Sequence, residues 1–192
     1  EGRHYAGGWW DWLTPFSILT GCAVVAGYGL LGATWLVMKT TGELREHAYR
    51  LSWWLLIATL IAIVAVSLAT PFLQAEYWRR WFEWPNILFT APIPVAVAAI
   101  TLLLLRSLAN KQDYRPFVLS LILFAITYAG LGVSMYPYIV PQSVTIWQAA
   151  APANSLNFMI FGVAVLVPII LIYTGWAYWV FRGKVDASSG YH

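Results

Sequence analysis

The side chains best suited to bind a haem or a metal fall outside the long apolar stretches of this sequence. The histidines lie in polar segments or at the terminus: His4, His47 and His192. A haem b buried among membrane helices usually needs axial His or Met ligands that project from those helices. The methionines have no histidine in an apolar stretch with which to pair: Met38, Met135 and Met159. We therefore predict that this chain binds no haem and no metal.

Acid–base and nucleophilic chemistry also lack candidate residues. The interior of every apolar stretch is free of Asp, Glu, Lys, Arg and His. A proton or ion pathway normally needs one such residue, despite an insertion cost of about 2.5–3.5 kcal/mol. The single cysteine, Cys22, cannot form an internal disulfide and is expected to be a small buried side chain. We predict no catalytic and no cofactor-binding residue, which favours an accessory subunit over an autonomous enzyme or pump.

The composition is that of an integral membrane protein. Of the 192 residues, 60% are hydrophobic and only 10% are charged, whereas a soluble domain has about 25% charged residues. The mean hydropathy is +0.68. The net charge of +3 does not indicate nucleic-acid binding, because the basic residues stand in short gaps between apolar stretches, where a membrane surface explains them more simply.

Five apolar stretches are long enough to cross a bilayer, which takes about 20 helical residues. They lie near 14–38, 52–73, 87–106, 116–137 and 155–181. Continuous apolar stretches of this length predict helices, since a barrel strand would show alternation. Thr14 and Pro15 suit the start of the first helix. We expect residues 1–192 to form one transmembrane helical domain with further sequence upstream, because residue 1 is Glu and the first residues look like the middle of a loop.

The distribution of Lys and Arg predicts an orientation. Eight of the eleven lie in the segments 39–51, 106–115 and 182–184, and the alternating segments hold only Arg3, Arg79 and Arg80. The positive-inside rule then places the start of the chain outside and its end in the cytoplasm. All twelve tryptophans fall near predicted span ends, as expected for indoles at the headgroup level.

The segment between the second and third spans, EYWRRWFEWPN at 76–86, has an amphipathic pattern. On a helix, Trp78, Trp81 and Phe82 would share one face, while Arg79, Arg80 and Glu83 would face water. Two interpretations are equally supported by the pattern. One is a short helix lying in the outer interface, and the other is an aromatic-rich loop.

Small residues are frequent in the first span, including the pairs Ala23/Gly27 and Gly29/Ala33. Such spacing lets helix backbones approach closely, so this span is expected to pack against other helices. Pro92 and Pro94 should make the start of the third span irregular, and Pro168 should kink the fifth. Where the first span ends, Gly42 permits a sharp turn. The adjacent Glu43 is a candidate ion-pair partner for Arg45 or Arg50, or for another subunit.

Three segments carry a resemblance to a known family. They are WDWLTPFSILTG at 10–21, GYGLLGATWLVMKTTGEL at 27–44 and NSLNFMIFGVAVLVPIILIYTGWAYWVFRGKV at 154–185. Together they resemble subunit II of the cytochrome bd-type quinol oxidases, including the cyanide-insensitive branch. The family begins a membrane helix with a segment like D-x-L-N-P-F, where Thr14 stands here in place of Asn, and ends it on a K-T-x-G-E-L segment.

The resemblance implies an accessory subunit of a terminal quinol:oxygen oxidoreductase of the respiratory chain, located in the bacterial cytoplasmic (inner) membrane. Subunit II of the family has eight helices, so the five spans here would be the fourth to the eighth. Its partner, subunit I, holds haem b, with or without haem d, and the quinol-oxidising loop. The acidic residues suggested for proton delivery lie in early helices of subunit II. The implied partners are subunit I, lipid, and quinone as substrate or structural ligand, with a small single-helix subunit as a further candidate.

Two other hypotheses remain open at this stage. The chain could be half of a small membrane transporter, which its Pro- and Gly-interrupted helices favour and its uncharged span interiors disfavour. It could also be a haem-bearing membrane anchor for a quinone site, which the lack of histidine in the spans disfavours.

Overall fold

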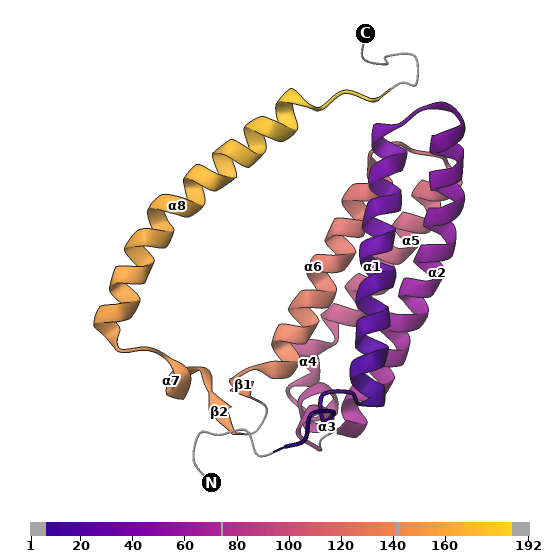
Figure 1. Ribbon diagram of the computed structural model, residues 1–192. Coiled ribbons are helices and arrows are strands. Elements are labelled where there is room, and N and C mark those ends of the chain that lie inside the picture. Colours follow the sequence, from indigo (N-terminus) through magenta and orange to yellow (C-terminus); the bar gives the residue numbers. More distant parts are fainter. Residues whose placement is uncertain (1–6, 74, 141–142, 186–192) are drawn as a thin grey trace. The chain divides into compact units, whose positions relative to one another are not determined.

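A computed structural model describes residues 7–73, 75–140 and 143–185 (Figure 1). The chain divides into two units, the first described as far as Ser134 and the second running from Met135 to Val185. Among the described residues, five helices are long and apolar enough to cross a membrane. They are α1 (Pro15–Lys39), α2 (Gly42–Leu73), α5 (Pro92–Ala109), α6 (Arg115–Met135) and α8 (Ala153–Val180). The predicted all-α membrane fold is confirmed.

The first helix begins where the sequence predicts. Thr14 is the N-cap of α1 and forms a capping box with Ser17: the Thr14 hydroxyl accepts from the Ser17 N–H, and the Thr14 N–H donates to the Ser17 hydroxyl. At the other end, the Thr40 hydroxyl donates to the Leu36 carbonyl at 2.7 Å. Gly42 then has a φ of +63°, a left-handed conformation that favours glycine. The turn between α1 and α2 therefore depends on this residue.

Helix α2 begins ten residues before the apolar stretch that marks the second span, at Gly42 rather than 52. Its first turns are polar, with Glu43 at the start, where a negative charge favours the helix N-terminus. Hydropathy marks where a helix enters lipid, whereas hydrogen bonding and capping decide where it begins. The polar segment expected as a loop is therefore the first part of a helix.

The third expected span, 87–106, is divided in the structure. A short α4 (Ile87–Thr90) precedes α5, which begins at Pro92. Pro92 lies in the first turn of α5, where its missing N–H costs no helical hydrogen bond. The irregular start expected from Pro92 and Pro94 is thus observed.

The core of the first unit lies among α1, α2, α5 and α6. Each of these four helices contributes to one cluster of buried apolar side chains: Leu30, Val37, Ala48, Tyr49, Leu56, Leu104, Leu108 and Leu123. Small residues on α1 permit close approach to two neighbours. A Cβ atom at Gly27 would lie 2.6 Å from a ring carbon of Phe124 on α6, and one at Gly29 would lie 3.0 Å from Leu55 on α2. The expectation that this span packs against other helices is confirmed at these two positions.

The segment between α2 and α4 contains a helix, α3 (Ala75–Phe82), so the loop interpretation of its amphipathic pattern is wrong. Its place in the outer membrane interface stays a prediction. It lies at the end of the bundle where α1 begins and α2 ends (Figure 1). The indole N–H of Trp81 donates to the Ser134 hydroxyl of α6 at 3.0 Å. The Thr90 hydroxyl of α4 donates to the Trp81 carbonyl at 3.2 Å. Trp81 therefore links α3 to the helices beside it.

We expect Trp81→Phe to lower the free energy of unfolding by about 1 kcal/mol, since the ring is kept and one hydrogen bond is lost. The Ser134 hydroxyl keeps its bond to the Gly130 carbonyl, so no buried group is left wholly unpaired. Thermal unfolding in detergent measures the change, with Trp84→Phe as the control because the Trp84 side chain is 76% exposed. Equal losses in the two variants would contradict the role given to the Trp81–Ser134 bond.

The second unit contains a small antiparallel hairpin that the sequence did not predict. Its strands are β1 (Tyr138–Val140) and β2 (Val144–Thr145), and α7 (Ile146–Ala149) follows directly. Thr145 caps α7 in a capping box with Gln148. The rings of Tyr136 and Trp147 meet edge to face with centroids 6.0 Å apart. Helix α8 follows and continues through Pro168.

Candidate functional site

The residues first considered for metal or haem binding do not gather into one place. No group of three His, Cys, Asp or Glu side chains that could hold a metal ion occurs in the part of the chain that the structure describes. His47 lies on the first turns of α2, where its Nδ1 is 2.9 Å from the Glu43 carbonyl oxygen. His4 and His192 lie outside the described residues.

Charged and polar groups do gather at the end of the bundle where α1 ends and α2 begins. We call this group the loop clamp: Arg45, Glu46 and Tyr49 from α2, with Lys111, Gln112 and Asp113 from the connection between α5 and α6. The loop from α1 to α2 and the loop from α5 to α6 lie at this same end of the first unit (Figure 1). The clamp therefore joins segments that are more than 60 residues apart in the sequence.

Arg45 is the centre of the loop clamp. Its Nη2 forms an ion pair with the Asp113 carboxylate and also donates to the Lys111 carbonyl at 3.2 Å. The guanidinium carbon lies 5.2 Å from the centre of the Tyr49 ring. The side chains of Arg45 and Asp113 are 25% and 28% exposed, so water screens this pair only in part.

Tyr49 and Lys111 add two further links. The buried Tyr49 hydroxyl donates to the Gln112 carbonyl at 2.9 Å, and Lys111 Nζ lies 2.8 Å from the Glu46 carboxylate. Arg45 and Tyr49 are four residues apart and so share one face of α2. Lys111 has a φ of +49°, an uncommon conformation for a residue with a side chain, in the short turn after α5. The helical spacing of Arg45 and Tyr49 therefore places the α2 half of the clamp, and the turn at Lys111 places the half from the α5–α6 connection.

Of the partners suggested for Glu43, Arg45 is wrong, because Arg45 pairs with Asp113. The other two, Arg50 and another subunit, stay predictions. Helix α2 begins at Gly42, and a residue two positions after Glu43 on a helix points to a different side. The signal that could have found the pair is the short connection between two spans that carries both Lys111 and Asp113.

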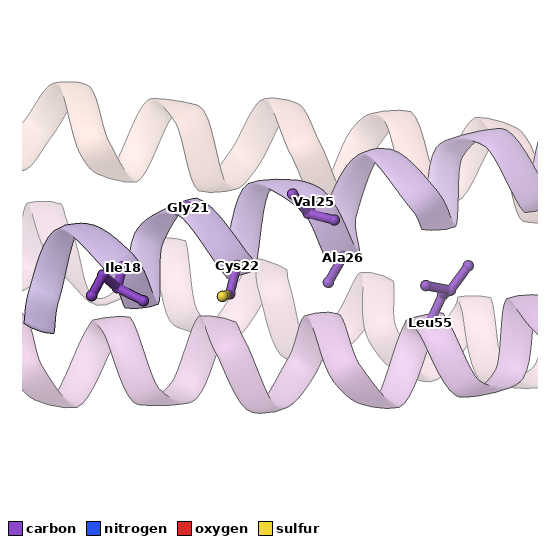
Figure 2. Close-up of a pocket in the computed structure, with 6 residues that line it drawn as sticks. All are labelled: Ile18, Gly21, Cys22, Val25, Ala26 and Leu55. Atoms are coloured by element: carbon purple, nitrogen blue, oxygen red, sulfur yellow. The ribbon is translucent and has the colours of Figure 1, made fainter.

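An apolar groove lies along α1 beside α2. It has a volume of about 530 Å³ and is lined by Ile18, Gly21, Cys22, Val25, Ala26 and Leu55. Figure 2 shows five of these residues on successive turns of α1 and Leu55 on the neighbouring α2. Cys22 is exposed there, so the expectation that it is buried is wrong. The sequence of α1 could not predict the exposure of Cys22, because all sides of this helix are apolar and none is marked as the buried one.

Comparison with known proteins identifies the family. A family model for cytochrome bd terminal oxidase subunit II matches residues 1–181. The chain belongs to this family. The resemblance drawn from the segments at 10–21, 27–44 and 154–185 is thereby confirmed.

Individual relatives carry names of the same kind. The chain is 30% identical to the cytochrome bd-I ubiquinol oxidase subunit 2 of Escherichia coli K12 in an alignment 214 positions long, which covers 95% of this chain and 56% of the relative. It is 30% identical to the probable cytochrome oxidase subunit 2 of Haemophilus influenzae, over 96% of this chain and 56% of that protein. A subunit 2 from Bacillus subtilis is 23% identical over 92% of this chain and 52% of that protein.

The chain spans about half the length of the curated relatives it matches. Together, the five candidate spans and the subunit II family place it in the bacterial inner membrane as a multi-pass protein. Membership of the family favours the oxidase-subunit hypothesis over the transporter and membrane-anchor alternatives.

Proposed function

We propose that this chain forms part of subunit II of a bd-type quinol:oxygen oxidoreductase and supports a haem-bearing subunit I. The observation that carries the proposal is the match of residues 1–181 to the subunit II family. In the complex, the haems of subunit I transfer electrons from quinol to oxygen, which is reduced to water. No autonomous activity is expected of this chain, and a quinone bound by it would be structural.

The supporting role is consistent with how the described residues are used. The contact of Gly27 with Phe124 and that of Gly29 with Leu55 hold three helices at close range. The loop clamp fixes the ends of α2, α5 and α6 to one another. These contacts make a well-packed apolar surface on which another membrane subunit can be held in one orientation.

We further propose that the loop-clamp end of the bundle faces the cytoplasm. That end carries Lys39, Arg45, Arg50, Arg106, Lys111 and Arg115, and the positive-inside rule favours cytoplasmic loops of this kind. Lys39 lies 5.2 Å from the centre of the Trp35 ring, an arrangement that suits a membrane–water boundary. The eight-helix organisation of the whole subunit stays a prediction.

The test of the supporting role uses the full-length subunit with an affinity tag, purified from its native membrane in mild detergent. We expect a larger partner to copurify and the absorption spectrum to show b-type haem bands, with or without d-type bands. After the two subunits are separated, the haem should remain with the larger one. Stoichiometric haem on the isolated tagged subunit, or recovery of the folded subunit without any haem-bearing partner, would overturn the proposal.

The transporter alternative has its own test. Vesicles that contain only the full-length subunit should take up no solute faster than protein-free vesicles. Substrate uptake by such vesicles would favour the transporter hypothesis instead.

A further inference from the structure

Helix α3 presents three different surfaces, which follow from the 3.6-residue turn of a helix. Trp78 and Phe82 are four residues apart on one side, and their rings lie tilted to each other with centroids 4.7 Å apart. Trp81 lies about 60° around the helix from Trp78, and its N–H is bound to Ser134 of α6. Arg79 and Glu83 lie on the side away from Trp81 and form an ion pair at 3.6 Å.

The contacts and exposure of these residues show what two of the three sides face. The Trp81 side is attached to the bundle through hydrogen bonds with α6 and α4. The Arg79–Glu83 side is charged and well exposed, at 71% and 58%, which suits water. The third side remains uncovered: Trp78 is 50% exposed and Phe82 is 52% exposed. Two large aromatic rings are therefore held outward between a protein-facing side and a water-facing side.

We propose that the Trp78–Phe82 side of α3 inserts into the phospholipid headgroup region next to the bundle. Helix α3 follows directly after α2, a candidate membrane span that ends at Leu73. It is also attached near the last residue of α6, at Ser134. Both neighbouring helices thus reach the end of their spans at the level of α3, which is the depth at which the hydrocarbon layer gives way to headgroups.

Lipid fits this side better than water or a charged partner does. Aromatic rings, and above all an indole, favour the headgroup level, where one edge is apolar and the other can reach water. Arg79 and Glu83 neutralise each other, so insertion is driven by the aromatic rings rather than by attraction to anionic lipid. Because Trp81 attaches α3 to α6, the inserted rings would hold the connection between α2 and α5 at the membrane surface. This inference does not rest on the proposed function.

Site-directed spin labelling tests the proposal in the full-length subunit. In a background where Cys22 is replaced by alanine and other cysteines are removed, single cysteines are introduced as Trp78→Cys, Phe82→Cys, Arg79→Cys and Glu83→Cys. Each variant is labelled with a nitroxide and reconstituted in vesicles of phosphatidylethanolamine and phosphatidylglycerol. Collision rates with oxygen and with a water-soluble nickel complex are then measured. Arg79→Cys and Glu83→Cys are the matched controls, because they lie on the same helix.

We expect oxygen to collide with the labels at 78 and 82 more often than the nickel complex does, and the reverse order at 79 and 83. The sign of the depth parameter should therefore change three times between residues 78 and 83, within one and a half turns. Preference for the nickel complex at 78 and 82 would show that this side faces water and would overturn the proposal. Immobilised labels shielded from both reagents would show that a protein, such as a second copy or another subunit, covers it, which also overturns it.

A second measurement keeps the proposal open to refutation if a cysteine variant misfolds. Vesicles containing lipids brominated near the headgroup should quench part of the tryptophan fluorescence of the unmodified protein. We expect Trp78→Phe to remove a part of this quenching, while Trp81→Phe removes less. Identical quenching in the protein with and without Trp78 would contradict insertion.

Discussion

Gly27→Leu is expected to lower the free energy of unfolding by about 3 kcal/mol, which is the upper part of the range for overpacked cores. The first added atom would lie 2.6 Å and 3.1 Å from two ring carbons of Phe124, and the leucine side chain extends further. Phe124 cannot turn away freely, because its ring packs against Tyr28 with centroids 5.4 Å apart. Thermal or denaturant unfolding of the purified full-length subunit measures the loss.

Gly32→Leu on the same helix is the control for this prediction. A Cβ atom at Gly32 meets nothing within 4 Å, and a glycine in a helix interior is less favourable than most residues by several tenths of a kcal/mol or more. We therefore expect Gly32→Leu to leave the free energy of unfolding unchanged or to raise it slightly. The double variant Gly27→Leu with Phe124→Ala should cost less than the sum of the two single variants, because the ring that causes the clash is gone. A loss at Gly32 as large as at Gly27 would mean that the helix itself, not the contact with α6, sets the cost.

Arg45→Met is expected to lower the free energy of unfolding by about 2 kcal/mol. Methionine keeps most of the apolar stem, so the loss reports the ion pair with Asp113 and the bond to the Lys111 carbonyl. The change should also loosen the α5–α6 connection, which amide hydrogen exchange of residues 110–114 can measure. Asp113→Asn should give a smaller loss, and the double-mutant cycle of the two should show positive coupling.

Arg79→Met is the matched control for Arg45→Met. The Arg79–Glu83 pair is longer, at 3.6 Å, and both side chains are well exposed. Exposed pairs of this kind contribute a few tenths of a kcal/mol. Equal losses in the free energy of unfolding for Arg79→Met and Arg45→Met would show that the loop clamp stabilises the protein no more than an exposed ion pair does. That result would refute its role in joining the helix ends.

The fold class could be predicted from the sequence because lipid sets a simple requirement. A segment that crosses the hydrocarbon must be apolar and about 20 residues long, and its backbone must pair internally. The start of α1 could also be predicted, because Thr14 and Pro15 act locally. The start of α2 could not, since the segment from Gly42 to Arg50 is polar and hydropathy does not distinguish a helix in water from a loop.

Contacts between distant segments account for most of what the sequence did not reveal. The small residues of α1 predict close packing, but they do not say which partner each glycine meets. Gly27 meets α6 and Gly29 meets α2, whereas Gly21 and Gly32 have open space around them. The pairing of Arg45 with Asp113 has the same origin, because the two residues come together only when α2 and the α5–α6 connection do. The β1–β2 hairpin also escaped prediction, because its strands have three and two residues.

The length of α2 has a consequence for its two ends. At 1.5 Å per residue, its 32 residues extend about 48 Å, well beyond a hydrocarbon layer of about 30 Å. The surplus includes the polar opening turns, so Arg45 and Glu46 lie beyond the apolar part of the helix. Dissolved salt weakens attraction between exposed charges over about 8–10 Å, so the Lys111–Glu46 pair, with side chains 60% and 51% exposed, should weaken more than the Arg45–Asp113 pair. The polar first turns of α2 therefore meet water, whereas its apolar part meets lipid. Higher ionic strength should therefore loosen the connection between α5 and α6. It should leave unchanged the apolar contacts of Gly27 and Gly29 within the bundle.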